Sequence, residues 1–414
     1  MQLLKNPIRP YAWGSRSTIA DLVGRPVPAP HPEAELWMGA HPGDPSKVVS
    51  ADGTEQSLLD VLAEDPTGQL GSAIVDRWGD RLPFLVKVLA ADAPLSMQVH
   101  PSAAQAAEGY AREEKLGIAR DAANRNYPDP TPKPELVCAL TEFHALAGFR
   151  DPHRTVELLR AVQTPALVAH VDLLAGEPNR EGLRALFTTW ITLPQTVIDA
   201  IMPDLLDNCV AHIKAHGEFE LECRTILELG ESYPGDAGVL AALLLNRLVL
   251  GPGEAIFLPA GNLHAYLAGT ALEVLANSDN ILRCGLTPKH VDVPELLRVL
   301  DFACGDMVVT DGEPDGQQRV YRTTAPEFEM SRLEWAAGER AAVKLSGGTP
   351  RILVCIDGTA VATTVDGREQ QLRRGESAWV PASDQDIVIT PSGTDRVRVF
   401  AATVGPDADG ASVL

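Results

Sequence analysis

One pattern occurs twice in this chain and constrains its fold more than any other feature. Residues 253–259 and 375–381 each read as glycine, glutamate, a short apolar stretch and proline. A turn followed by a short buried strand is a unit that recurs in double-sheet β-barrels. The first copy continues to His264, whereas the second continues to Asp386 and has no histidine. The repeat predicts two related barrels, of which only the first holds a metal.

The hydrophobic spacing divides the chain into three blocks. Apolar runs bounded by Pro, Gly and Asp predict strands in residues 1–150, for example over 84–90 and 136–140, and again after Gly251. Between them the apolar residues recur at helical spacing, as in Leu240, Leu243, Leu244 and Leu248. We therefore expect a mainly β protein with an α insertion. The predicted domains are a catalytic barrel (1–150 and 251–309), an inserted helical domain (151–250) and, after a linker at 310–318, a C-terminal β-domain without metal ligands (319–406).

Composition limits the partners. The 414 residues carry a formal net charge of -21, which argues against nucleic acid or an anionic membrane as a partner. A phosphorylated small molecule remains compatible, provided that its site is a local basic island. The six cysteines form no CxxC pair, and the N-terminal residues contain no apolar leader segment. Reduced thiols and a cytoplasmic location are the expectation.

Three short motifs contain candidate metal ligands. Gln98 and His100 are two residues apart, so on a strand they face the same side, although a solvent-facing strand end has the same pattern. His264 follows Pro259 and Gly261, which allow a strand to end and the chain to turn back. Glu135 opens an apolar strand after Lys133 and Pro134, where a surface charge pair is the alternative. Imidazole, carboxylate and amide oxygen suit zinc or a similar cation.

Basic residues supply the candidate phosphate contacts. Arg283 and Lys289 follow His264 within a polar segment, 276–289, that could instead be a loop satisfying its own backbone. Lys87 lies inside the otherwise apolar run 84–89, where burial is costly unless the lysine faces a polar cavity or an edge. These lysines and the arginine are where a basic island is expected.

Taken in order, these motifs resemble those of the type I mannose-6-phosphate isomerases over nearly the whole chain. The matching segments are residues 11–15, 34–42, 82–101, 133–135, 233–236, 258–267 and 276–289. The resemblance implies a cupin-type (jelly-roll) catalytic barrel and a second, smaller cupin-like domain. It also implies one zinc ion per chain, held by Gln98, His100, Glu135 and His264. The chain departs from the family at Pro132, where a histidine is usual.

The resemblance implies that mannose 6-phosphate and fructose 6-phosphate are interconverted by proton transfer through an enediol. Arg283 falls on the family's active-site arginine, and Lys133 is the candidate base, with Lys87 or a zinc-bound hydroxide as rivals. Ser96, Lys87 and Lys289 are the candidate substrate contacts. The implied setting is carbohydrate metabolism, with GDP-mannose biosynthesis as the expected pathway, and a monomer is expected. The alternatives are isomerisation of another phosphorylated aldose, a non-catalytic sugar-binding cupin and an Fe(II) cupin oxygenase.

Overall fold

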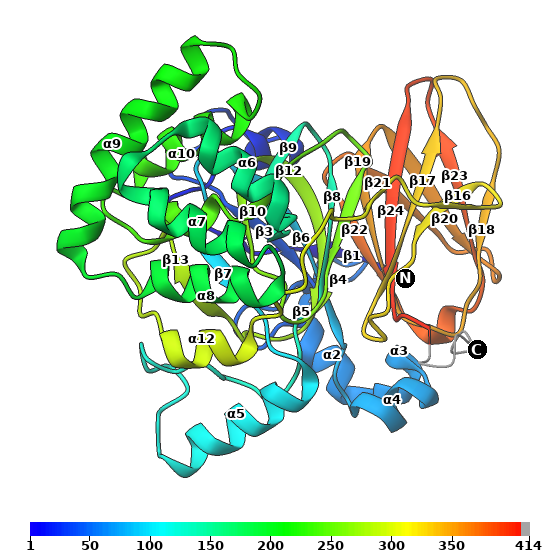
Figure 1. Ribbon diagram of the computed structural model, residues 1–414. Helices are drawn as coiled ribbons and strands as arrows, with labels where there is room; N and C mark the ends of the chain where they lie inside the picture. The colour runs from blue at the N-terminus through cyan, green and yellow to red at the C-terminus, as the bar shows by residue number, and fades with distance from the viewer. Residues whose placement is uncertain (407–414) are drawn as a thin grey trace.

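The computed structural model describes residues 1–406 and shows a mostly β molecule with helices (Figure 1). Figure 1 shows a cluster of helices at one end of the molecule and the C-terminal strands at the other, with the remaining strands between them. The expectation of a mainly β protein with helices is therefore confirmed. No helix within residues 1–406 has the length and apolar character that a membrane crossing requires.

An eleven-stranded sheet surrounds the candidate site. Its longest member, β12 (His264–Ala276), pairs through its first residues with β7 and β9 and through its second half with β6 and β8. Gly269 lies between the two halves at φ +108, and a Cβ there would collide with the backbone of Glu142. Glycine thus permits one strand to serve two sets of partners. The other strands are β2 (Ile8–Arg9), β3 (Glu35–Met38), β6 (Phe84–Ala91), β7 (Met97–Val99), β8 (Glu135–Ala139), β9 (Phe143–Phe149), β10 (Leu245–Leu250), β11 (Ala255–Leu258), β13 (Leu282–Gly285) and β14 (Val309–Thr310).

This sheet does not close into a ring within the part of the chain that the structure describes. Its pairing path runs from β14 through β11, β8, β12, β6 and β3 to β2, and the two end strands do not pair with each other. The expected closed barrel is thus not seen in the hydrogen-bond pattern. The cupin arrangement stays a prediction.

A second, nine-stranded sheet joins the two ends of the chain. β1 (Gln2–Lys5) pairs with β22 (Ser377–Val380) on one side and with β4 (Lys47–Val49) on the other. A smaller four-stranded sheet completes the C-terminal region. The nine-stranded sheet also contains β5 (Glu55–Ser57), β15 (Glu313–Asp315), β16 (Gln318–Tyr321), β17 (Glu329–Trp335), β19 (Arg351–Asp357) and β24 (Val397–Thr403), and the four-stranded sheet contains β18 (Val343–Leu345), β20 (Thr359–Thr364), β21 (Glu369–Arg373) and β23 (Ile387–Ser392).

Six helices between β9 and β10 cover one end of the first sheet. Their apolar faces meet strand residues in one continuous core that includes Phe149, Phe187, Trp190 and Phe302. Asp151 caps the first of these helices through its side chain, which explains why the helical block begins there. The helices are α6 (Pro152–Val162), α7 (Val168–Gly176), α8 (Arg180–Ile191), α9 (Gln195–Lys214), α10 (Glu220–Ser232) and α11 (Gly238–Ala242).

Three local predictions need correction. Residues 1–150 contain helices as well as strands, namely α1 (Thr18–Leu22), α2 (Leu58–Glu64), α3 (Pro66–Leu70), α4 (Ser72–Trp78) and α5 (Ala103–Lys115). Leu248 lies in β10, because pairing with β9 overrides the helical spacing of its leucines. The predicted linker 310–318 contains β15, which forms a hairpin with β16.

The remaining helix is α12 (Val293–Val299). The division into three domains stays a prediction.

Candidate functional site

Two histidines and a glutamate meet inside the first sheet. His100 follows β7, Glu135 opens β8 and His264 opens β12, so three strand ends bring them together. Nε2 of His100 lies 3.2 Å from Oε1 of Glu135, and Nε2 of His264 lies 3.5 Å from Oε2 of the same carboxylate. The three side chains are buried, and their ligand atoms all lie within 4.8 Å of one another.

Backbone carbonyls set the tautomer of both imidazoles. Nδ1 of His100 lies 2.8 Å from the carbonyl of Asn280, and Nδ1 of His264 lies 3.0 Å from that of Asn262. A carbonyl only accepts, so each Nδ1 carries the proton and each Nε2 presents a lone pair to Glu135. Nε2 of both rings and Oε2 of Glu135 are buried without a hydrogen-bond partner within residues 1–406. These three acceptor atoms point toward one another with no donor between them, which is the arrangement that binds a cation.

The charge states also suit metal binding. Burial lowers the pKa of His100 to about 4, so its imidazole is neutral at pH 7. Burial alone would raise the pKa of Glu135, but the neighbouring His100 and Lys133 hold it well below its usual range. Nζ of Lys133 is 3.1 Å from Oε1 of that carboxylate. The site therefore combines the neutral imidazole of His100 with the ionised carboxylate of Glu135, the forms in which these two groups bind zinc.

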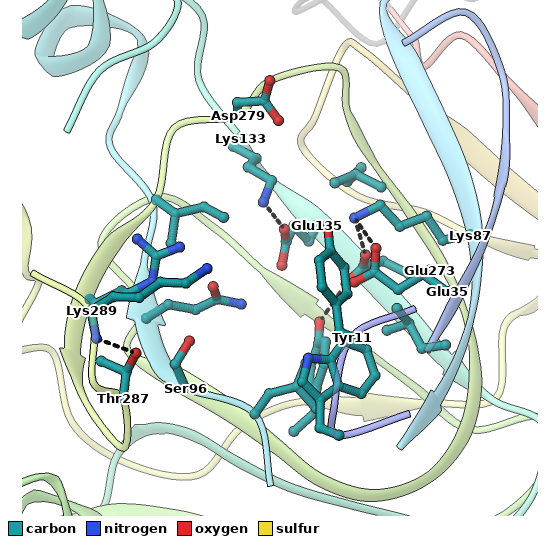
Figure 2. Close-up of a pocket in the computed structure, with 18 of the residues that line it drawn as sticks. Tyr11, Glu35, Lys87, Ser96, Lys133, Glu135, Glu273, Asp279, Thr287 and Lys289 are labelled. Atoms are coloured by element: carbon teal, nitrogen blue, oxygen red, sulfur yellow. Dashed lines mark hydrogen bonds and ion pairs between the residues drawn. The ribbon is translucent and has the colours of Figure 1, made fainter. Parts of the chain in front are cut away.

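A cavity of about 420 Å³ opens beside this cluster. Gln98 lines it and is paired in register with His264 on one side and Arg283 on the other. Figure 2 shows Ser96, Thr287 and Lys289 on one side of the cavity and Lys87, Glu35 and Glu273 on the opposite side, with Lys133 and Glu135 between them. Seven of the nine predicted site residues line the cavity, namely Lys87, Ser96, Gln98, Lys133, Glu135, Arg283 and Lys289, and the other two, His100 and His264, contact Glu135.

One end of the cavity is basic. Burial lowers the pKa of Arg283, and burial together with the charge of Arg283 lowers the pKa of Lys289. Lys289 and Arg283 therefore lie close enough for their positive charges to interact. The hydroxyls of Ser96 and Thr287 line the same cavity, and Thr287 accepts a hydrogen bond from the backbone of Lys289. Two cations with two hydroxyls form an anion-binding end in a protein whose net charge is -21.

The other end contains a buried charge cluster that the sequence motifs revealed only in part. Nζ of Lys87 lies 3.7 Å from Glu35 and 3.5 Å from Glu273, and these charges outweigh burial and raise the pKa of the lysine. Lys87 is therefore held as an ammonium ion. Burial and the charge of Glu135 raise the pKa of Glu273 to about 7, and Tyr266 donates a hydrogen bond to it. Glu273 is the cross-strand partner of Lys87. A glutamate inside an otherwise apolar strand was the sequence signal that could have indicated a buried charged group here.

A polar network that sequence reasoning missed holds the loops around the metal cluster. The side-chain nitrogen of Asn280 donates to the carbonyls of Asp129 (2.8 Å) and Thr131 (2.7 Å). The carboxylate of Asp129 accepts hydrogen bonds from Ser278 Oγ and from the backbone nitrogen of Asp279. Asn280 is also the residue whose carbonyl orients His100. The network thus connects the segment before Lys133 and Glu135 to a metal-site histidine.

His41 and Asp279 also line the cavity and form a hydrogen bond with each other. His41 accepts a hydrogen bond at Nδ1 from the backbone of Gly43, so Nε2 carries the proton and faces Asp279 at 3.2 Å. The hydrogen bond from His41 lowers the pKa of Asp279. The side chain of Asp279 therefore presents an ionised carboxylate next to the cavity.

The fold and the site together define the class of this protein. It is a mostly β protein in which a buried His/Glu/His metal centre lies beside a cavity that has a basic end, as in a metal-dependent enzyme. Residues 1–152 match the family described as "Phosphomannose isomerase type I, catalytic domain". The mannose-6-phosphate isomerase of Escherichia coli K12 is 40% identical over 401 residues, covering 95% of this chain and 98% of the relative. The human mannose-6-phosphate isomerase is 31% identical, covering 91% and 92%. The chain belongs to the type I mannose-6-phosphate isomerase family.

Solved structures agree. A crystal structure of a mutant phosphomannose isomerase from Salmonella typhimurium superposes with a TM-score of 0.87 at 37% identity, covering 98% of this chain and 100% of that one. A zinc-bound mannose 6-phosphate isomerase superposes with a TM-score of 0.86 at 38% identity, covering 98% and 99%.

Proposed function

We propose that this protein interconverts mannose 6-phosphate and fructose 6-phosphate as a zinc-dependent aldose–ketose isomerase. The observation that carries the proposal is the buried His100–Glu135–His264 cluster at one cavity with the basic pair Arg283 and Lys289. The relatives named above have this activity in their names, and one neighbouring structure contains zinc.

The proposed ligands are Gln98, His100, Glu135 and His264. A zinc ion bound there supplies positive charge that stabilises oxygen anions forming on the sugar. Asn262 and Asn280 hold the two imidazoles through their carbonyls, so that Nε2 of each ring points at Glu135. We expect one ion per chain, because the C-terminal copy of the repeat has Asp386 where the first has His264.

The basic end of the cavity orients the substrate. In the proposal, Lys289, Ser96 and Thr287 contact the phosphate, and the guanidinium of Arg283 lies between the phosphate and the reacting carbons. Arg283 is permanently charged, so it stabilises an oxyanion and does not transfer a proton. This arrangement leaves C1 and C2 at the end that contains Lys133, Lys87 and Glu273.

Isomerisation requires a proton to leave C2 and a proton to arrive at C1. Lys133 remains the proposed base, since its Nζ lies beside the metal cluster and is buried with it. Lys87 is a weaker candidate, because two carboxylates hold its proton. Glu273 joins the candidates, since a carboxyl group with a pKa of about 7 exchanges protons at neutral pH.

The test is a coupled assay that measures fructose 6-phosphate formed from mannose 6-phosphate. We expect activity to disappear after chelation and to return with zinc. Glucose 6-phosphate and other aldose phosphates, tested in parallel, separate this function from isomerisation of a different sugar. Turnover that persists in the fully chelated protein contradicts the proposal. Retention of all activity under anaerobic conditions separates it from a cupin oxygenase.

The proposal includes the domain arrangement, the oligomeric state, the location and the pathway expected from the sequence. We propose that the first sheet is a cupin-type catalytic unit, that the helices 151–250 form an insertion and that residues 319–406 form a second cupin-like unit. We also propose a monomer that acts in the cytoplasm on a small sugar phosphate, in a route that supplies GDP-mannose.

A further inference from the structure

A second cavity, of about 340 Å³, lies in the C-terminal region, far along the chain from the metal cluster. We name it the C-terminal cavity. One wall is a face of the nine-stranded sheet, where Glu329 on β17, Thr403 on β24 and Arg351 on β19 are consecutive partners in register. Side chains of directly paired residues point to the same face. The other wall consists of β18 and the segment after it, including Lys344, Ser346 and Thr349.

The cavity contains a guanidinium without a full set of partners. Nη1 of Arg351 is buried and has no hydrogen-bond partner among residues 1–406. The two carboxylates that act on it at longer range are already paired, Asp386 with Lys344 at 2.6 Å and Glu329 with Arg322 at 3.4 Å. A buried donor without a partner is costly, so a ligand acceptor there would be favourable.

Arg351 is the lining cation whose charge is not balanced by an ion pair among residues 1–406. Three cations, Arg322, Lys344 and Arg351, line the cavity. Arg322 is paired with Glu313, Asp315 and Glu329, and Lys344 is paired with Asp386. Burial lowers the pKa of Arg351 to about 10, which still leaves it protonated at neutral pH. The unpaired guanidinium of Arg351 is therefore the group in this cavity that can receive an anion.

The sequence repeat relates the wall of the C-terminal cavity to the metal cluster of the catalytic unit. Asp386 has the position after Gly375 that His264 has after Gly253, and each directly precedes or opens the next strand, β23 or β12. In the C-terminal copy, Asp386 accepts a hydrogen bond from the backbone nitrogen of Gly347 at 2.8 Å. Asp386, at the position of a proposed metal ligand of the first unit, thus holds a wall of the cavity in the second.

We propose that the C-terminal cavity binds a small polyol that carries one phosphate or carboxylate group. Arg351 receives the oxyanion, and the hydroxyls of Ser331, Ser346 and Thr349 bond the hydroxyls of the ligand. This site is separate from the isomerase reaction, and its test measures binding alone.

The experiment is isothermal titration calorimetry on the zinc-loaded protein with glycerol 3-phosphate, D-gluconate and inorganic phosphate as probes. We compare the wild type with Arg351→Gln and with Arg396→Gln, an exposed arginine paired with Glu334 in the same region. Loss of a charge-assisted hydrogen bond should weaken binding at least about tenfold in Arg351→Gln and leave Arg396→Gln unchanged. Glycerol 3-phosphate and gluconate identify a phosphate and a carboxylate ligand, respectively.

Two results would overturn the inference. One is equal affinity of the wild type and Arg351→Gln for every probe. The other is inorganic phosphate binding as tightly as both polyols, which removes the role of the hydroxyls. If Arg351→Gln does not fold, hydrogen–deuterium exchange of the wild type decides. A saturating polyol anion should then protect residues 344–351 and β24, and unchanged exchange there contradicts the site.

Discussion

Replacing Asn280 with alanine tests whether the polar network holds the metal site. Asn280 is 0% exposed, and its side chain bonds the carbonyls of Asp129 and Thr131 and the backbone nitrogen of Asp129. Asn280→Ala leaves these three groups without their partner. Asp129 and Thr131 are only half-buried, so water replaces part of the bonding. About 1 kcal/mol for each group, the low end for unsatisfied buried groups, gives a loss of about 3 kcal/mol.

The effect should extend to the metal, because the carbonyl of Asn280 orients His100 at 2.8 Å. The variant keeps this carbonyl but loses the bonds that hold it in place. Loss of a group that orients a metal ligand typically reduces metal affinity about 10–100-fold. We therefore expect a lower unfolding temperature in calorimetry and zinc binding weakened by that factor in competition with a chelator.

Asn277→Ala is the matched control. Asn277 is also a buried asparagine, and its side chain bonds the carbonyls of Ala40 (3.3 Å) and Leu82 (3.2 Å), which do not belong to the network. It should destabilise the protein while leaving zinc affinity near that of the wild type. If Asn280→Ala binds zinc as tightly as Asn277→Ala does, the network does not position His100 and the reasoning is refuted.

Three further changes test the proposed site and the sheet. His264→Ala should lose zinc and turnover together while the protein stays folded, since the surrounding core is apolar; elemental analysis that still finds one zinc per chain would remove His264 from the ligand set. Arg283→Ala should lower kcat about 10²–10³-fold with zinc content unchanged, and a change confined to KM would show that Arg283 only binds the ground state. Gly269→Ala should reduce stability by about 2–4 kcal/mol, because φ is +108 and the Cβ collides with the backbone of Glu142. Thermal unfolding equal to that of the wild type would mean that β12 does not need a glycine there.

Several parts of the fold and site could be predicted from the sequence because they depend on local patterns. Apolar runs bounded by turn residues identified β6, β8 and β11, since a short buried strand has a local signature. The change to helical spacing after Asp151 predicted the helices that follow, and Asp151 is the N-terminal cap of the first of them, α6. The motifs around His100, Glu135 and His264 likewise selected the three residues that meet in the metal cluster.

Pairing between distant segments was decided only by the tertiary structure. No local pattern shows that β1 lies beside β22, or that Leu248 joins a strand instead of a helix. Glu273 acquires its character only when strand register places it opposite Lys87 and near Glu135. Asn280 bonds a partner 151 positions earlier in the chain. A sequence thus reports periodicity and residue chemistry, whereas register and burial arise from contacts among residues that are neighbours only after folding.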